Sequence, residues 1–419
     1  MRFLILNRLP LSGLRFPDWL GPAHEAVLLT DAAALSSDPG ERAAQLAGYA
    51  HVEVVQNYHF NPLVELRALT LHAGSPFDRV IALSEFDLLR AARLRGLFGV
   101  PGQDVRSATA FRDKVRMKEL LRASDIPVAD HAPAASFADV HRFVEEQGYP
   151  VVVKPRRGGG SVGVHVLENP QDLRDLLEAC PELGTDDGAQ LMCERYVKHE
   201  LFHVDGIFVN GEAKLMWPSS QGDSSCLDII AGLSLHSALL DPDDPLLDPL
   251  LDLTRRALTA LPMPDSFLFH AEVFRTPDGE LFFNEVASRM GGGLIDRMVT
   301  LGFGITMPEV LVRSLADNEP APVPPLPLTS AGLSLFPPRA GTLVRIPEDC
   351  PVPGVVSYQR HAEPGTVLVA AQASVEKIGA VLATGSSRAE VEATLAAAGR
   401  WFEESTRITA GDATGEETG

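Results

Sequence analysis

The chain has 419 residues, of which 45% are hydrophobic and 22% charged, and its formal net charge at pH 7 is -20. These values are typical of a globular protein, and the length predicts two or three domains. The negative charge argues against nucleic acid or an anionic membrane as a partner, because phosphate binding needs a basic surface. No apolar run approaches the roughly 18 residues of a membrane span.

The N-terminus and the cysteines indicate the compartment. Residues 1–7 begin as a short apolar strand and not as a signal peptide. The cysteines form no C-x-x-C pair, so neither a zinc site nor a disulfide framework is indicated. We therefore expect a cytoplasmic protein.

Short apolar runs before residue 107 predict the strands of a small α/β layer. We expect this layer to form a first domain, residues 1–107. The runs are Phe3 to Leu6, Ala26 to Leu29, His51 to Val55 and Arg79 to Leu83.

Two helices are predicted, one before and one after the segment from Tyr149 to Val164. Apolar residues at helical spacing predict an amphipathic helix from Phe111 to Ala123, in which Lys114 and Lys118 lie one turn apart. Asn169-Pro170 opens another helix, with an N-cap residue followed by proline at the first turn.

The segment from Tyr149 to Val164 places a lysine at the end of an apolar strand and a glycine loop directly after it. The β-branched residues Val151 to Val153 predict a buried strand that leads to Lys154. Gly158 to Gly160 carry no Cβ, so backbone N–H groups there can close onto a phosphate. We interpret the segment as a nucleotide-phosphate flap; a mobile surface hairpin is the alternative.

The same glycines also match the pattern G-x-G-x-x-G, through Gly158, Gly160 and Gly163. A Rossmann fingerprint requires a helix to begin there, whereas valines at every second position from Val162 to Val166 have the periodicity of a strand. No Gly-Lys-Ser/Thr follows, which excludes a Walker loop. The pattern therefore predicts a β-hairpin with a glycine tip.

The stretch from Glu194 to Glu200 connects an apolar run to a strand that begins at Phe202. Asn210-Gly211 then marks a tight hairpin turn. Either glutamate alone could be an ordinary solvated charge. Because strands flank the stretch and the phosphate flap lies upstream, we interpret it as a hinge that holds a nucleoside.

A second hairpin brings two carboxylates together. Phe269 to Arg275 and Glu280 to Val286 flank the turn Thr276-Pro-Asp-Gly279. With a two-residue loop Glu272 faces Glu285; with a three-residue loop and a glycine bulge the pairing moves by one. Opposed like charges among apolar residues are destabilising unless a cation lies between them, and magnesium is the ion expected. The alternative is that both carboxylates lie on a wet face and repel weakly.

Three further features have possible roles that depend on the residues around them in the sequence. Arg289 lies next to a second glycine loop, where a guanidinium suits the recognition of a carboxylate or phosphate. His270 is either a site group or a satisfied structural histidine. The segment from Trp217 to His236 is either the acceptor side of the site or an ordinary polar loop.

Together these elements resemble the ATP-grasp superfamily, from about Ser107 to Arg313. The matching elements are the lysine-bearing helix, the lysine with its glycine flap, the hinge and the glutamate pair. His270-Ala-Glu272, Glu285-Val-Ala-Ser-Arg289 and the C-terminal run Gly379 to Gly385 look most like the L-amino acid ligases.

The resemblance implies an α/β protein with α+β elements. It would have the ATP-grasp fold, with an N-terminal Rossmann-like α/β domain and a small C-terminal β-rich lid. After residues 1–107 we expect an ATP-grasp domain, residues 108–317. Its phosphate-flap subdomain would be residues 108–200, and its metal and substrate subdomain residues 201–317. A C-terminal subdomain, residues 329–407, and a disordered tail, residues 408–419, would complete the chain.

The resemblance also implies roles for individual residues. Magnesium, or manganese in its place, would bind Glu272 and Glu285. Arg289 would fix a carboxylate or stabilise an acyl phosphate, and with Lys154 it would be catalytic. Ala287 stands where many members carry a metal-binding asparagine, so the number of metal ions is open and Asn284 is an alternative ligand. The expected ATP contacts are Lys114, Lys154, Gly159, Gly160 and Ser161 for the phosphates, Glu194, Tyr196 and Val197 for adenine, and Glu200 for the ribose.

The implied activity is that of an ATP-dependent carboxylate–amine ligase. ATP would phosphorylate the carboxylate of an amino acid or similar compound, and an amine from an amino acid, peptide or carrier would then displace phosphate, leaving ADP. Two alternatives stay open: a carboxylase-type or purine-type member with another acceptor, and a nucleotide-binding regulatory protein without catalysis. The expected partners are small-molecule or peptide substrates, and a homodimer is one of the open oligomeric states.

Overall fold

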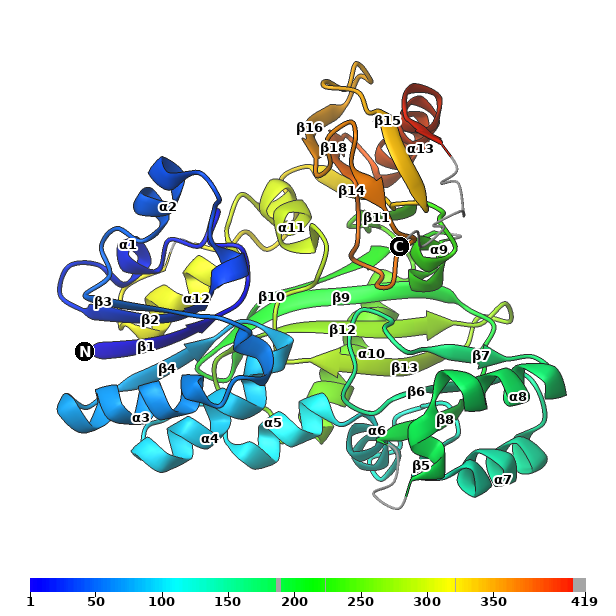
Figure 1. The fold of residues 1–419 in the computed structure, drawn as a ribbon, viewed down its shortest axis with the longest axis horizontal. Coiled ribbons are helices and arrows are strands. Elements are labelled where there is room, and N and C mark those ends of the chain that lie inside the picture. Colours follow the sequence, from blue (N-terminus) through cyan, green and yellow to red (C-terminus); the bar gives the residue numbers. More distant parts are fainter. Residues whose placement is uncertain (186–189, 223, 321, 410–419) are drawn as a thin grey trace, which may run out of the picture.

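The computed structural model describes residues 1–185, 190–222, 224–320 and 322–409. Figure 1 shows an N-terminal α/β layer in blue, a long central sheet in green and yellow-green, a smaller sheet with its helices in teal, and a C-terminal unit in orange and red. The expected α/β fold with α+β elements is confirmed.

The N-terminal layer alternates strands and helices. Its elements are β1 (Arg2–Asn7), α1 (Phe16–Leu20), β2 (Glu25–Asp31), η1 (Ala32–Ala34), α2 (Pro39–Gln45), β3 (His51–Val55), η2 (Tyr58–Phe60), α3 (Leu63–Gly74), β4 (Arg79–Ala82), η3 (Glu85–Asp87) and α4 (Leu88–Phe98). The strands form a parallel sheet in the order β3-β2-β1-β4. β1 and β2 are buried apolar runs, as expected for parallel strands that are covered on both faces. The strands predicted from the apolar runs are confirmed.

Two helices, α5 (Val105–Arg112) and α6 (Lys114–Arg122), follow where the sequence predicted one. They meet at Asp113, which has non-helical φ and ψ of -98° and 103°. Its carboxylate accepts hydrogen bonds from the backbone N–H groups of Val115 and Arg116. The prediction of a single helix from Phe111 was wrong at its start, because an N-capping aspartate ends one helix and begins the next.

The smaller sheet carries the predicted flap. Its elements are β5 (His131–Ala134), α7 (Phe137–Gln147), β6 (Val151–Pro155), β7 (His165–Leu167), α8 (Pro170–Ala179), η4 (Pro181–Gly184) and β8 (Leu191–Arg195). The strands are antiparallel in the order β5-β8-β6-β7. The predicted strand from Val162 was wrong in its first residues, because Ser161 and Gly163 take left-handed φ of 60° and 70° and β7 begins only at His165. Residues 156–164 are therefore a long loop and not a tight glycine tip.

The central sheet runs through the middle and the C-terminal part of the chain. Its strands are β9 (Glu200–Val209), β10 (Glu212–Ser220), β11 (Leu235–Leu239), β12 (Phe267–Arg275), β13 (Leu281–Ala287), β14 (Ser330–Phe336), β16 (Val355–Arg360) and β18 (Gly379–Gly385). The order is β13-β12-β9-β10-β11-β14-β18-β16, and the paired strands are antiparallel. The helices between its strands are α9 (Cys226–Ile230), α10 (Leu247–Ala260), α11 (Ile295–Phe303) and α12 (Met307–Leu315).

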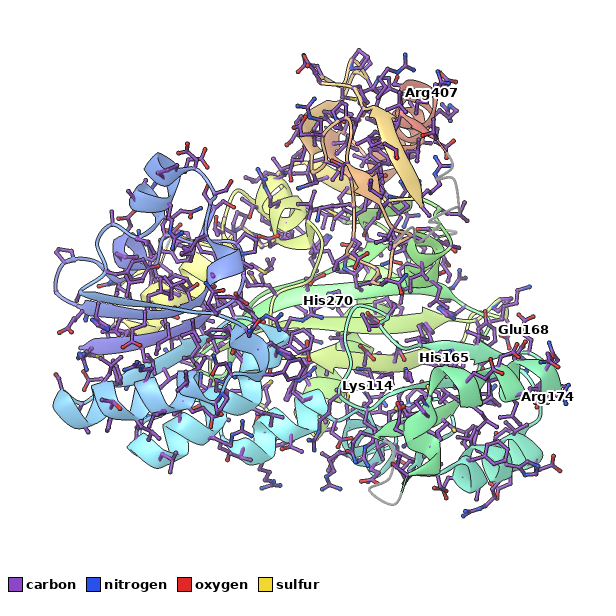
Figure 2. All side chains as sticks on the ribbon, viewed as in Figure 1. Lys114, His165, Glu168, Arg174, His270 and Arg407 are labelled. Atoms are coloured by element: carbon purple, nitrogen blue, oxygen red, sulfur yellow. The ribbon has the colours of Figure 1, made fainter. Side chains whose placement is uncertain are left out.

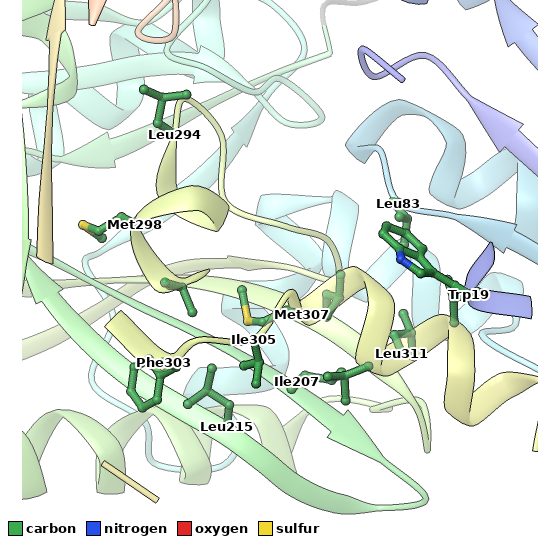
Figure 3. Close-up of a cluster of buried hydrophobic side chains, with 14 of the residues drawn as sticks. Trp19, Leu83, Ile207, Leu215, Leu294, Met298, Phe303, Ile305, Met307 and Leu311 are labelled. Atoms are coloured by element: carbon green, nitrogen blue, oxygen red, sulfur yellow. The ribbon is translucent and has the colours of Figure 1, made fainter. Parts of the chain in front are cut away.

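Different helices cover the two faces of this sheet. α10 and α6 pack on one face, around Phe111, Leu250 and Phe269. α11 and α12 pack on the other, in a cluster that Trp19 and Leu83 of the N-terminal layer complete (Figure 3). This cluster joins the N-terminal layer to the sheet.

No single helix in the described part of the chain is long and apolar enough to cross a membrane. Taken together, α11 and α12 would be long and apolar enough for a membrane span, but the two helices are bent by 85° at the break between them. Both helices contribute residues to the buried cluster of Figure 3.

The hairpin of β12 and β13 combines the two registers that the sequence allowed. Glu272 pairs with Glu285, as a two-residue loop predicts. A register shift lies between Glu272 and Val273, so that Val273 pairs with Phe283 closer to the turn. The expectation that the two carboxylates are neighbours is confirmed, and a bulge beside them absorbs the longer turn.

The C-terminal unit adds β15 (Gly341–Arg345), β17 (Val367–Leu368), α13 (Arg388–Ser405) and β19 (Arg407–Thr409). β17, β15 and β19 form a separate small sheet, and α13 covers β14 and β18 through a core that includes Phe336, Leu395 and Phe402. Of the tail predicted to be disordered, residues 408 and 409 belong to β19, and residues 410–419 lie outside the described residues.

Candidate active site

A cavity of about 260 Å³ lies between the flap sheet and the central sheet. Its walls come from β6, the flap loop, the hinge after β8, the strands β9 and β11 to β14, and the loop before α11. Figure 2 labels Lys114 on α6 and His270 on the central sheet, on two elements that meet at this cavity. The predicted site residues that line it are Lys114, Lys154, Gly159, Gly160, Ser161, Glu194, Tyr196, Val197, Glu272, Glu285 and Arg289.

Glu200 differs from the other predicted residues. It is not among the lining residues found in the described part of the chain. Its Oε2 lies 3.3 Å from Nη1 of Arg275, on the neighbouring strand β12. Its role at the ribose stays a prediction.

Glu194 is a buried carboxylate between two lysines. Its oxygens lie 2.5 Å from Nζ of Lys118 and 2.7 Å from Nζ of Lys154. Burial alone would raise the pKa of Glu194, but the two ammonium groups outweigh it and lower the pKa to about 2. Burial also disfavours the charge on Lys154, yet Glu194 and Glu285 hold its pKa above the usual value. The carboxylate therefore holds both lysines in place, and its contact with adenine stays a prediction.

Lys114, the first residue of α6, contacts both the flap loop and one of the two paired glutamates. Nζ of Lys114 donates to the carbonyl of Gly158 at 2.9 Å and lies 3.4 Å from Oε2 of Glu285. Asp113 holds the same loop, since both of its oxygens accept from Arg156 at 2.9 and 3.0 Å. The N-terminus of α6 thus fixes the start of the flap loop.

The paired glutamates have more partners than the sequence indicated. Nδ2 of Asn284 donates to Glu272 at 2.8 Å, and Nε2 of His270 lies 3.8 Å from the same carboxylate. Burial would raise the pKa of Glu272, but His270 and Asn284 lower it to about 2. With Lys114 beside Glu285, the two negative charges are partly compensated in the protein itself. Groups of the protein therefore favour the ionised form of Glu272.

Arg289 is held by a residue of the N-terminal layer that the sequence analysis missed. Its Nε donates to Glu85 at 2.7 Å, and the same carboxylate forms an ion pair with Arg112. Burial would raise the pKa of Glu85, but Arg289, Arg112 and Lys114 lower it. Glu85 begins η3, three residues after the end of β4, at the carboxyl end of a parallel sheet, where ligand-binding groups collect in α/β folds. This position after a strand of a parallel sheet was the signal in the sequence that could have identified Glu85 as a site residue.

A buried polar network, also missed, extends from the glutamate pair into the sheet. Asp205 accepts from Nδ1 of His203 at 2.6 Å and from Nδ1 of His270 at 2.8 Å. Nε2 of His203 lies 2.7 Å from Oγ of Ser237. Burial would lower the pKa of His270, but Asp205 and Glu272 raise it to about 9. The signal in the sequence was His203 and Asp205 at alternate positions of an apolar strand, on one face.

The second glycine loop is explained by this network. A Cβ at Gly291 would lie 2.8 Å from Oδ1 of Asp205 and 2.6 Å from Cγ2 of Ile295. A side chain there would displace either the carboxylate or α11. The loop before α11 therefore has to approach the sheet as bare backbone.

The flap loop is closed over the cavity. The carbonyl of Gly160 accepts a hydrogen bond of 2.8 Å from the backbone N–H of Ser374, in the C-terminal unit. Ser374 and Val375 line the cavity beside the flap. The C-terminal unit thus forms part of the cover, as expected for a lid.

Two family models match the chain. One, described as L-amino acid ligase C-terminal domain 2, matches residues 334–400. The other, described as carbamoyl-phosphate synthase L chain, ATP binding domain, matches residues 113–204 and so covers α6, the flap and the hinge.

Relatives agree with these matches. An L-arginine-specific L-amino acid ligase from Bacillus subtilis is 28% identical over 298 residues, which cover 70% of this chain and 71% of the relative. The solved structure of an L-amino acid ligase from Bacillus licheniformis matches with a TM-score of 0.73 and 17% identity, over 98% of this chain and 99% of the other.

A third match is a carboxyaminoimidazole ribonucleotide synthase from Aspergillus clavatus complexed with ATP. Its TM-score is 0.69 at 16% identity, over 96% of this chain and 98% of the other. The solved structures show the fold, and the family models and the sequence relative show the class of enzyme. The chain belongs to the ATP-grasp superfamily and is an ATP-dependent carboxylate–amine ligase related to the L-amino acid ligases.

Proposed function

We propose that the protein activates the carboxylate of an amino acid as an acyl phosphate and joins it to the amine of a second amino acid or peptide, releasing ADP and phosphate. The observation that carries this proposal is the Glu272/Glu285 pair, which faces the same cavity as Lys114 and Lys154. In a nucleotide complex this arrangement would put the cationic groups and the paired carboxylates around the terminal phosphate. Transfer of the γ-phosphoryl group needs charge neutralisation at that point.

The nucleotide would bind with its phosphates under the flap. Lys114 and Lys154 supply fixed positive charge, because Glu194, Glu285 and the carbonyl of Gly158 hold their ammonium groups in place. The backbone of Gly159, Gly160 and Ser161 would close over the phosphates. The base would lie against apolar groups that line the hinge end, which include Val152, Val166, Val197, Leu201 and Phe274.

The glutamate pair fits a magnesium ion. Carboxylate oxygens are the ligands that magnesium prefers, and Oδ1 of Asn284 is a buried oxygen without a hydrogen-bond partner among the described residues. Glu272, Glu285 and Asn284 would hold the ion, with Asn284 in place of the asparagine that Ala287 replaces. A bound magnesium would neutralise charge on the phosphates.

Arg289 would bind the carboxylate that is activated. Its guanidinium lines the cavity, while Glu85 accepts from its Nε and the carbonyl of Met290 accepts from its Nη1, so that Nη2 is the nitrogen that would bind an anion. The closed flap and the C-terminal unit exclude water, which would otherwise hydrolyse an acyl phosphate. Binding of the carboxylate by Arg289 and exclusion of water would both favour amide formation over simple hydrolysis of ATP.

The Glu285→Gln variant tests the metal and phosphoryl-transfer roles. Activation is measured as hydroxamate formed from each of the L-amino acids with ATP and hydroxylamine. We expect Glu285→Gln to need a much higher magnesium concentration or to lose activity, with an unfolding free energy in metal-free buffer within about 1 kcal/mol of the wild type. The exposed Glu280→Gln, in the turn of the same hairpin, is the control. A large loss of stability without metal would make the pair structural and contradict the proposal.

Arg289→Ala tests the carboxylate site separately. It should bind a non-hydrolysable ATP analogue normally in calorimetry but lose about 2–4 kcal/mol of transition-state stabilisation in hydroxamate formation, as for one preorganised donor. Arg289→Lys should not restore activity, because an ammonium lacks the planar fork. The exposed Arg297→Ala, on α11, should behave as the wild type. An equal loss of ATP affinity would instead place Arg289 at the nucleotide.

A further inference from the structure

Ser237 is a polar group in an apolar part of the cavity wall. It lies on β11 and is 2% exposed, and its neighbours Leu235, Leu333 and Leu335 also line the cavity. Leu235 pairs with Leu335 and Ser237 with Leu333 across β11 and β14. These strands lie beyond β9 and β10 from the glutamate pair, so this wall is the end of the cavity away from the phosphates.

Two buried residues hold the hydroxyl of Ser237 through a chain of hydrogen bonds, in which His203 contacts Ser237 and Asp205 contacts His203. Oγ lies 2.7 Å from Nε2 of His203, and Nδ1 of His203 lies 2.6 Å from Oδ2 of Asp205. His203 and Asp205 are each 1% exposed. The order of contacts is that of a Ser-His-Asp arrangement, and each group has one orientation that satisfies its neighbours.

This order fixes the direction of the hydroxyl. Asp205 is a carboxylate and only accepts, so Nδ1 of His203 carries the proton that it donates. In this tautomer, with the proton on Nδ1, Nε2 is an acceptor and the Ser237 hydroxyl donates to it. Among the described residues no other side chain forms a hydrogen bond with Oγ, so its lone pairs can accept from a donor in the cavity.

We propose that Ser237 binds the amino group of the second substrate, and that His203 and Asp205 are positioning residues that keep its hydroxyl an acceptor. The inference rests on the proposed function, since it takes an amine to be the group that attacks the acyl phosphate. An amine offers the N–H donors that this hydroxyl can accept. The leucines around it fit an amine whose side chain is apolar.

The location agrees with the order of the reaction. The γ-phosphoryl group would lie at Glu272 and Glu285, and strands β9 and β10 lie between β12, which carries Glu272, and β11, which carries Ser237. Neighbouring strands are about 4.8 Å apart, so about 14 Å of sheet is available for the phosphoryl group, the acyl group and the amine in a row. Ser237 is where the amine end of such a row would lie.

The test separates activation from amine binding. Hydroxamate formation at high hydroxylamine concentration reports activation and identifies the donor amino acid. Formation of the acyl-L-leucinamide from that donor, followed by mass spectrometry, reports the amine, because L-leucinamide has no carboxylate to be activated. Ser237→Ala should raise the KM for L-leucinamide about tenfold or more, with hydroxamate formation and the KM for ATP within about twofold of the wild type.

Matched variants separate binding from folding. Ser237→Thr keeps the hydroxyl and should keep the KM for L-leucinamide within about threefold. Ser334→Ala removes another buried hydroxyl, on the neighbouring strand and outside the cavity wall, and should change neither step. Because His203 acts through Ser237, His203→Gln added to Ser237→Ala should raise this KM no further than Ser237→Ala alone.

The outcomes are distinct. An unchanged KM for L-leucinamide in Ser237→Ala, or no acyl-leucinamide from a wild type that forms hydroxamate, would overturn this inference alone. Loss of hydroxamate formation in Ser237→Ala would place the hydroxyl in the activation step and also overturn it. No hydroxamate from the wild type with any L-amino acid would contradict the proposed function itself, and this inference with it.

Discussion

Glu194 connects two lysines that reach it from different elements, Lys118 from α6 and Lys154 from β6. The side chain of Lys118 is 0% exposed, so the carboxylate is the partner that makes its burial tolerable. Lys118, to which the sequence analysis gave no role in the site, therefore holds a carboxylate of the cavity wall. Lys154 and Glu194 both line the cavity, and Lys118, which is not among the lining residues found in the described part of the chain, holds Glu194 in place.

Glu194→Gln should therefore destabilise the protein by about 3 kcal/mol, because it leaves a buried ammonium without a counter-charge. Glu119→Gln, an exposed partner of Arg116 on the same helix, should cost less than about 1 kcal/mol. Chemical unfolding of both variants at neutral pH measures the difference. Equal unfolding free energies for the two variants would show that Glu194 does not stabilise the buried lysines.

The same residue predicts a pH dependence. The pKa of Glu194 is lowered from 4.5 to about 2, so its contribution to stability is complete above about pH 4.5 and is lost as the pH falls toward 2. The stability difference between the wild type and Glu194→Gln should accordingly shrink as the pH is lowered from 6 to about 3. A difference that stays constant over this range would contradict the ionised pair.

Residues whose neighbours in the sequence carry the signal could be predicted. Lys154 follows a valine strand, and Glu272 and Glu285 flank one turn, so their positions follow from local pattern. Glu85 could not be reached in this way, because its contact with Arg289 spans 204 residues of chain. Lys118 and Ser237 were missed for the same reason: their partners come from other elements.

At the scale of elements, the flap loop is held at its start and at its tip. Lys114, Arg112 and Asp113 bind its first residues, and the backbone N–H of Ser374 binds its tip at Gly160. The sequence predicted the loop and its lysine but placed the second strand too early, since a left-handed serine is not visible in a valine pattern. The helix break at Asp113 was missed because apolar spacing continues across it, while the cap depends on one carboxylate.

Ser374→Pro should open the flap, because proline has no N–H to donate to Gly160. More ADP should then form for each amide bond, as water reaches the acyl phosphate. Ser374→Ala keeps the N–H and is the matched control, expected to give close to one ADP per bond. If the proline variant keeps that ratio, the contact between the flap and the C-terminal unit does not exclude water.

At the scale of the whole molecule, the cavity draws on distant parts of the chain. Glu85 comes from the N-terminal layer, Ser374 from the C-terminal unit, and the strands between them supply the glutamate pair. The superfamily and the general fold could be predicted from the sequence, because the matching motifs lie in order along one segment. How the outer parts close on that segment could not, because it depends on side-chain contacts between units.

The central claim is that a carboxylate oxygen attacks the γ-phosphorus of ATP. It is tested by labelling both carboxylate oxygens of the donor amino acid with a heavy oxygen isotope and analysing the nucleotide and phosphate after amide formation. The acyl-phosphate route predicts ADP as the nucleotide and one labelled oxygen in each phosphate released. Label in AMP, with pyrophosphate as the other product, would contradict the account and with it the roles proposed for Glu272, Glu285 and Arg289.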